Sequence, residues 1–205
     1  MKKIIIFLTI FIVCIFSYNI YGYSYDEKIQ MAKNLIEEQF SQNKDISGYE
    51  VKLAYKDSKI FTFKIELSGW NSETSNIDIY KNYMTFSADD GRYIAINDIV
   101  NINNQSFINL FRAKEKQEQK KLEQKENDEG IYYIIEDVNI SDFSFYIKPN
   151  GGIVFSYYFS STISFTKENI EGSEIMNEYY VDIPFTLNEI KPYIKKGSII
   201  EYLFK

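Results

Sequence analysis

The residues that could carry chemistry in this chain are mostly carboxylates, because the common nucleophile and metal-ligand types are scarce. The sequence has no histidine, and its only cysteine, Cys14, lies in an apolar N-terminal run. Zinc sites of the Cys/His type and Ser-His-Asp or Cys-His nucleophiles all need residues that this chain lacks. General acid–base catalysis would have to come from Asp, Glu, Lys or Tyr. We therefore expect no cofactor.

Two adjacent carboxylate pairs, Asp89-Asp90 and Glu136-Asp137, come closest to an acid–base site. Neighbouring side chains on an extended chain point apart, and Asp is common in turns for conformational reasons. Glycosidases need two carboxyls about 5 to 9.5 Å apart across a cleft, which spacing along a sequence does not show. No Ser-x-x-Lys motif opens a helix, and no alternating Asp/Asn run predicts a calcium loop. We expect neither a metal site nor an enzyme.

The composition indicates an acidic globular protein. The 205 residues include 23 Lys+Arg and 29 Asp+Glu, a formal net charge of -6, with 45% hydrophobic side chains. This length suits one compact domain with a sizeable core. A nucleic-acid partner is not expected, because phosphate contacts need a basic face.

Residues 1–22 have the pattern of a signal peptide. Lys2 and Lys3 precede the apolar run 4–16, and Gly22 offers a small residue at a cleavage site. The run is 13 residues long, whereas crossing a bilayer takes about 20. Cleavage after Gly22 would leave 21 basic and 29 acidic side chains, a net charge of -8. The protein is expected to be exported, to a periplasm or to the outside.

Two alternatives to cleavage remain open. The segment could stay as an uncleaved anchor, which would be the chain's only contact with a membrane. Lipidation of Cys14 is disfavoured because Val13 stands where a lipoprotein motif has a small residue.

The periodicity of the remaining chain predicts an α+β fold: an antiparallel sheet with helices packed on one face. Ser24 with Glu27, and Thr186 with Glu189, have capping-box spacing at two helix starts. Helices are predicted at 24–43, at 103–111 after an Asn103 or Asn104 cap, and from 186; strands are predicted at 51–56, 61–67, 77–86, 92–96, 143–147, 153–159 and 179–183.

Local signals add detail to these elements. The third strand is predicted to slip register between Tyr80 and Tyr83, because its apolar positions change parity there. Asp89-Asp90-Gly91 and Asn150-Gly151 predict turns, since Asp, Asn and Gly tolerate positive φ.

The expected domain runs from 23 to 205, with an N-terminal half at 23–111 and a C-terminal half at 131–205. Between them, residues 112–130 form a charged helical extension, which we expect to be solvated. Lys114 with Glu118 and Glu118 with Lys121 have the spacing of helical ion pairs. The alternative is a partner-binding arm, but the run has no apolar stripe for a partner to bury.

Short motifs across both halves resemble the RsiV-like family of unknown function. They are the strand 60–67, Thr85-Phe86-Ser87, Asp90-Gly91-Arg92, Ile96-Asn97-Asp98-Ile99, Gly152-Ile153-Val154-Phe155, and Ile183-Pro184-Phe185 with Glu189-Ile190. That family forms the extracellular part of lysozyme-sensing anti-sigma factors and also occurs beside peptidoglycan deacetylase domains. The resemblance implies an α+β fold and a lysozyme-type muramidase as partner.

The chain also departs from the family pattern. Residues 71–76 replace a Gly-Ala-His-Pro segment, and Ser160, Ser164 and Phe165 stand near positions where family members have Tyr and Pro-Tyr. An anti-sigma role is not expected, because only three residues precede the apolar run. Loops that could engage a partner are thus the ones that diverge.

The function expected from these observations is that of a non-catalytic envelope protein that binds another protein. A strongly acidic domain would be steered towards a basic enzyme. The candidate partner-binding residues are Trp70, Tyr158, Ser160 and Phe165. Trp70 could instead be a tryptophan at the edge of the core. The alternative function is a glycan- or peptidoglycan-binding module that uses aromatic side chains as stacking platforms.

Overall fold

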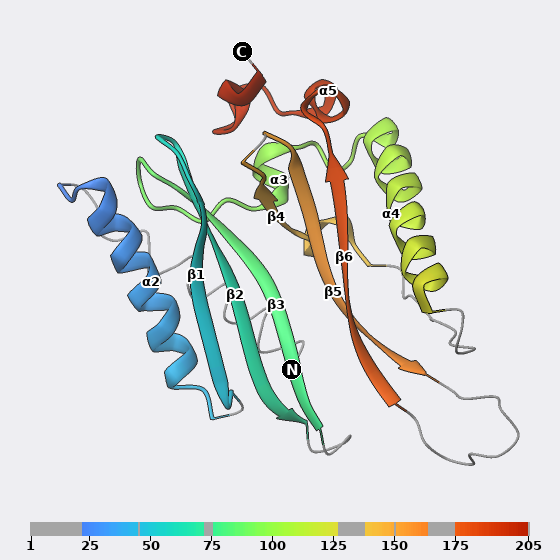
Figure 1. Ribbon diagram of the computed structural model, residues 1–205. Coiled ribbons are helices and arrows are strands. Elements are labelled where there is room, and N and C mark those ends of the chain that lie inside the picture. The colour runs from blue at the N-terminus through green and yellow to red at the C-terminus, as the bar shows by residue number, and fades with distance from the viewer. Residues whose placement is uncertain are drawn as a thin grey trace, which may run out of the picture.

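The computed structural model describes residues 22–44, 46–71, 76–126, 138–149, 151–163 and 175–204. These ranges contain two three-stranded antiparallel sheets, and a long helix covers the outer side of each sheet (Figure 1). The α+β class expected from periodicity is confirmed. The predicted signal peptide lies almost entirely outside the described residues. Within those residues, no helix has the length and apolar character needed to cross a membrane.

The first helix, α2 (Tyr25–Ser41), begins and buries its apolar face as its sequence predicts. The Ser24 backbone N–H donates to Glu27 Oε2 at 2.7 Å, and the Glu27 N–H donates to Ser24 Oγ at 3.4 Å, which completes the capping box. Ala32, Ile36 and Phe40 are buried against the first sheet. The helix therefore fixes which side of that sheet is core.

The first sheet has the order β1 (Gly48–Lys56), β2 (Ile60–Asn71) and β3 (Asn76–Ser87). Strand alternation places the odd-numbered residues of β2 under α2. The Phe61 ring stacks on Phe86 of β3 with a centroid distance of 5.4 Å. The core on this side comprises Ala32, Ile36, Phe40, Val51, Phe61, Phe63, Ile65, Met84 and Phe86.

Two predictions for this half are wrong. β3 pairs with β2 in one uninterrupted register, without the expected slip between Tyr80 and Tyr83. The apolar positions change parity because Phe86 lies under α2, whereas Tyr83 faces the second sheet. The expected strand at 92–96 is reduced to a single bridge between Phe86 and Tyr93, since the short helix α3 (Ile96–Ile99) follows at once.

The second half builds a separate core under α4 (Gln105–Glu126). Asn104 caps this helix, because its Oδ1 accepts from the N–H groups of Ser106 at 3.0 Å and Phe107 at 3.1 Å. The sheet order is β4-β5-β6. The remaining elements are η2 (Ile140–Asp142), β4 (Ser144–Ile147), β5 (Ile153–Ile163), β6 (Ile175–Phe185), α5 (Leu187–Ile190), η3 (Lys191–Tyr193) and η4 (Glu201–Phe204).

Aromatic rings dominate the core between α4 and the second sheet. Phe107 and Phe111 of the helix contact Phe155 of β5 and Phe185 of β6, with centroid distances of 5.6 to 6.3 Å. The predicted turn before β5 is present: Gly151 has φ 86°, a conformation that glycine adopts without strain. The capping box of Thr186 and Glu189 is also confirmed at the start of α5.

The charged extension is helical as far as Glu126, but its first turn is not solvated. Glu115 is buried, and Arg112 NH1 lies 2.7 Å from its Oε2. Lys114 does not pair with Glu118 as expected, because its Nζ lies 2.8 Å from Glu189 Oε1 instead. The predicted pair of Glu118 and Lys121 is confirmed at 2.6 Å.

Candidate functional site

The two sheets meet through the sides that their helices leave uncovered. Thr85 Oγ1 of β3 donates to the Phe145 carbonyl of β4 at 3.0 Å. Thr62 Oγ1 lies 2.9 Å from Thr85 Oγ1, and Thr62 must be the donor because the single hydroxyl proton of Thr85 is already committed. We call this side the inter-sheet face. Its residues are Thr62, Lys64, Glu66, Ile79, Lys81, Tyr83, Thr85, Tyr146, Ser156 and Asp182.

On this face, the carboxylate of Asp182 of β6 accepts hydrogen bonds from two hydroxyl groups. Ser156 Oγ donates to Asp182 Oδ1 at 2.6 Å, and Tyr146 OH donates to Oδ2 at 3.3 Å. The Tyr146 ring stacks on Tyr83 of β3 with centroids 4.1 Å apart, which joins the sheets a second time. Burial, and then the charge of Asp182, raises the pKa of both tyrosines. Both phenols therefore stay protonated near neutral pH.

Exposure rises steeply along β3 on the inter-sheet face. Thr85 is 1% exposed and Tyr83 is 7% exposed, whereas Ile79 is 53% exposed. The sheets thus cover each other at the Thr85 end, and the face is open at the Ile79 end. We call the latter the open end.

Charged side chains border the open end. Lys64 Nζ lies 2.5 Å from Glu66 Oε1, and Lys81 Nζ lies 5.5 Å from the centre of the Tyr83 ring. The hydrogen bond from Lys64 lowers the pKa of Glu66 against a smaller opposing effect of burial. An exposed isoleucine beside paired charges and stacked tyrosines is a mixed surface of the kind found in protein interfaces.

Three of the four residues expected to bind a partner belong to strands that form this face. Trp70 of β2 pairs with Ile77, and Tyr158 and Ser160 of β5 pair with Tyr180 and Glu178. Strand alternation gives position 70 the parity of Glu66, and gives positions 158 and 160 the parity of Ser156. The side chains of Trp70, Tyr158 and Ser160 lie outside the described residues, as does all of Phe165.

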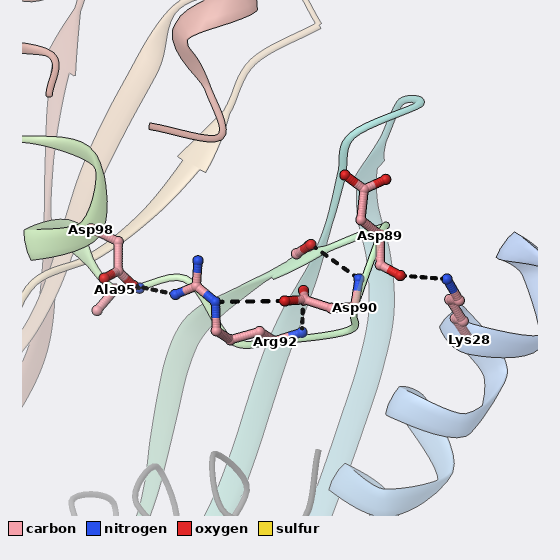
Figure 2. Close-up of polar contacts among 7 residues, drawn as sticks. Lys28, Asp89, Asp90, Arg92, Ala95 and Asp98 are labelled. Atoms are coloured by element: carbon pink, nitrogen blue, oxygen red, sulfur yellow. Dashed lines mark hydrogen bonds and ion pairs between the residues drawn. The ribbon is translucent and has the colours of Figure 1, made fainter. Parts of the chain in front are cut away.

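Asp89 and Asp90, the first carboxylate pair considered for acid–base catalysis, lie in a hydrogen-bonded turn after β3 (Figure 2). Asp90 Oδ1 accepts from the Arg92 N–H at 3.2 Å, and Gly91 between them has φ 68°. Asp98 Oδ2 accepts from Arg92 NH1 at 3.2 Å and from the Ala95 N–H at 3.0 Å. Arg92 therefore ties the turn after β3 to the start of α3.

Asp89 has different partners from Asp90. Its Oδ2 lies 3.6 Å from Lys59 Nζ, while its carbonyl accepts from Lys28 Nζ of α2 at 2.7 Å (Figure 2). Burial opposes ionisation of Asp90, but the Ser87 hydroxyl and Arg92 outweigh it and lower the pKa of the carboxyl. Asp90 is thus charged near neutral pH and is not poised as a general acid.

Two further observations bear on chemistry. Among the described residues, no group of three or more His, Cys, Asp or Glu side chains could hold a metal ion. The second pair weighed for catalysis, Glu136-Asp137, lies outside those residues. The network around Asp182 was not predictable from the sequence, because a serine, a tyrosine and an aspartate on three different strands leave no spacing signal.

The chain matches no protein-family model and no curated protein. The likeness to the RsiV-like family therefore rests on the short motifs given above. In the structure, Asp90-Gly91-Arg92 forms the braced turn, Ile96–Ile99 forms α3, and Ile183-Pro184-Phe185 ends β6. These motif residues shape the fold, so they do not identify a ligand by themselves.

Proposed function

We propose that this protein is an exported, non-catalytic domain of the cell envelope that binds another protein through the open end of the inter-sheet face. The observation that supports this most is the exposure of Ile79 on a sheet face whose other end is fully buried. A large apolar side chain kept exposed on the same sheet face as two stacked tyrosines favours an interaction surface. The positions of Trp70, Tyr158 and Ser160 in the strands that carry this face add to the argument.

A basic, lysozyme-type muramidase is the partner that we propose. The net charge of -6, or -8 after cleavage, would steer a cationic protein towards this domain. The open end itself carries two lysines, Lys64 and Lys81, and one glutamate, Glu66, so the attraction comes from the net charge of the whole domain. Charge would therefore govern the rate of encounter, and aromatic and aliphatic contacts would govern the lifetime of the complex.

The test is a titration of the exported form of the protein with a c-type lysozyme at low and moderate salt, following both binding and muramidase activity. We expect binding that weakens with salt. Ile79→Glu and Trp70→Ala should each raise the dissociation constant by about tenfold or more, as central interface residues do. Leu53→Glu is the matched control, because Leu53 is similarly exposed but lies on the α2 side of the same sheet.

Two outcomes would replace this proposal. Absence of binding at about 50 μM lysozyme, well above the range of specific complexes, would remove the muramidase as partner. Retention of the protein on insoluble peptidoglycan in high salt would instead support the glycan-binding alternative, since stacking on aromatic rings is not screened by ions.

A further inference from the structure

Among the described residues, β1 is an edge strand that pairs with another strand on one side only. The described part of the first sheet ends at β1, which pairs with β2 alone. From Tyr49 to Ala54, every residue except Val51 is exposed. Tyr49 and Leu53 are each 42% exposed, which is high for large apolar side chains. An edge of this kind is a template for pairing with another strand.

The sequence of this edge is self-complementary about Val51. On either side stand Glu50 and Lys52, and beyond them Tyr49 and Leu53. In antiparallel pairing with a second copy about a two-fold axis at Val51, Glu50 lies opposite Lys52 of the second copy, and Tyr49 lies opposite its Leu53. Residues directly opposite each other share a sheet face, and opposite charges in that position attract.

Each face of β1 would gain favourable contacts in this pairing, apolar ones on the α2 side and ionic ones on the other side. Tyr49 lies on the α2 side, where its ring is 5.9 Å from that of Phe40, and Val51 is part of the core on that side. Pairing would cover the exposed Tyr49 with Leu53 of the second copy. On the other side, Lys52 Nζ and Glu50 Oε2 lie 2.7 Å apart in one copy, with side chains 63% and 49% exposed. Each would gain a second partner of opposite charge.

A bulge in β1 favours a two-fold axis at Val51 over one at Leu53. The β1–β2 register shifts between Leu53 and Tyr55, and Tyr55 OH donates to Asp57 Oδ2 at 2.7 Å. A two-fold axis at Leu53 would bring Glu50 opposite Lys56, but that ladder would run through the bulge, where pairing is disrupted. The axis at Val51 uses only the regular segment before the bulge. Its symmetry is closed, so pairing stops at two copies.

We propose that two copies of this protein associate through antiparallel pairing of β1 about Val51, which makes one six-stranded sheet of order β3-β2-β1-β1-β2-β3. Edge strands that avoid association commonly carry lysines or a bulge. Here the charges alternate in a self-complementary order, and the bulge lies at one end. Glu50 and Lys52 lie on the inter-sheet side, where they pair with Glu66 and Lys64 of β2. The pairing edge is nevertheless two strands away from Ile79 of β3, so Ile79→Glu distinguishes dimerisation from partner binding at the open end.

The test is sedimentation equilibrium on the exported protein with charge-swapped variants. We expect a dimer for the unchanged chain. Glu50→Lys and Lys52→Glu should each raise the dimer dissociation constant by about tenfold or more, because two symmetry-related pairs become repulsive. The double variant E50K/K52E restores the complementary order and should dimerise again. An equimolar mixture of the two single variants should form a heterodimer, since lysines of one copy then face glutamates of the other.

Controls separate the edge from general effects of charge. Lys121→Glu changes an exposed charge on α4, and Ile79→Glu changes the open end; neither should alter the dimer. Thermal unfolding checks that every variant is folded. A monomer up to about 0.5 mM, near the weakest association that counts as specific, would overturn the proposal. Failure of both the double variant and the mixture to restore the dimer would overturn the pairing about Val51.

Discussion

At the scale of single residues, Asp57 makes the most hydrogen bonds of the carboxylates described. It lies in the turn between β1 and β2, where its Oδ1 accepts from the N–H groups of Lys59 at 2.7 Å and Ile60 at 3.0 Å. Its Oδ2 accepts from Tyr55 OH at 2.7 Å and from Tyr202 OH of η4. Burial opposes ionisation, but these four donors outweigh it and lower the pKa of Asp57.

We expect Asp57→Asn to lower the free energy of unfolding by about 1 to 3 kcal/mol at pH 7, because an amide replaces one acceptor oxygen with a donor. The pH dependence follows from the lowered pKa. The contribution of Asp57 is present above its unfolded pKa of about 3.9 and is lost as pH falls through the folded value. Urea unfolding should be measured between pH 2.5 and 7 at intervals of about half a pH unit. The free energy of unfolding should fall less towards acid pH for the variant than for the unchanged chain.

The control for this variant is Asp89→Asn, whose carboxylate makes a single exposed ion pair at 3.6 Å. That change should cost less than about 0.5 kcal/mol. If the free energy of unfolding falls equally towards acid pH for Asp57→Asn and for the unchanged chain, then the lowered pKa of Asp57 does not contribute to the pH dependence of stability.

The residue scale also shows what a sequence can predict. The caps of Ser24, Asn104 and Thr186 were predictable because each bonds a backbone group two or three residues away. The bond from Tyr202 to Asp57 spans 145 positions. No local rule contains that contact, because it arises only when the C-terminal 3₁₀ helix folds over the first sheet.

At the scale of elements, the middle of α4 is held on the second sheet by the charge of Lys114. Lys114 Nζ lies 2.8 Å from Glu189 Oε1, donates to the Pro184 carbonyl at 3.1 Å, and lies 5.1 Å from the centre of the Phe185 ring. The hydrogen bond from Lys114 is the main reason why the pKa of Glu189 is lowered. Lys114 belongs to the charged run 112–130, which the sequence predicts to be solvated, yet it attaches α4 to β6 and α5.

Lys114→Ala should therefore lower the free energy of unfolding by about 1 to 2 kcal/mol, through the lost charged hydrogen bonds and cation–π contact. The matched control is Lys121→Ala on the same helix, whose exposed pair with Glu118 should be worth less than about 0.5 kcal/mol. An NMR titration of Glu189 gives a second measurement: its pKa should rise towards the ordinary value in Lys114→Ala only. Equal losses for the two lysines would show that Lys114 is as solvated as its neighbours.

Two of the elements that the sequence misjudged, β3 and the charged part of α4, share one physical cause. In β3 and in the middle of α4, a second layer covers residues that would otherwise face water. Tyr83 is buried by Tyr146 of the other sheet, and Lys114 by the end of β6. Periodicity detects the side that faces the nearest helix. Hydrophobic periodicity does not detect a second covered side, because the residues that pack on that side are polar or charged.

At the scale of the whole molecule, hydroxyl groups join the two sheets where side chains are most deeply buried. Thr62 donates to Thr85, and Thr85 donates to the Phe145 carbonyl of the other sheet. The two changes to valine should therefore differ. Thr85→Val removes both bonds and leaves the buried Thr62 hydroxyl without its acceptor, so it should cost about 2 to 3 kcal/mol, whereas Thr62→Val should cost about 1 kcal/mol. Urea unfolding of both variants measures this; equal losses would contradict the assigned direction of donation.

The absence of histidine from the sequence predicts how the stability of the whole molecule depends on pH. No side chain with an unperturbed pKa between about 5 and 8 is present, so the free energy of unfolding should be level across that range. On the acid side, Asp57, Asp90, Glu66 and Glu189 all have lowered pKa values. Their contribution is present above their unfolded pKa values of about 4 and is lost as pH falls through the folded ones.

On the alkaline side, burial raises the pKa of Tyr25, Tyr55 and Tyr93 to about 12. The proton is held more tightly in the folded state, so their contribution is complete below the unfolded tyrosine pKa of about 10 and is lost as pH rises towards 12. Urea unfolding from about pH 3 to pH 11.5 should trace a plateau with two falling limbs. Tyr93→Phe keeps the ring that packs on Phe86 and should flatten only the alkaline limb. A decline between about pH 6 and 8 would contradict this account, because no side chain of ordinary pKa titrates there.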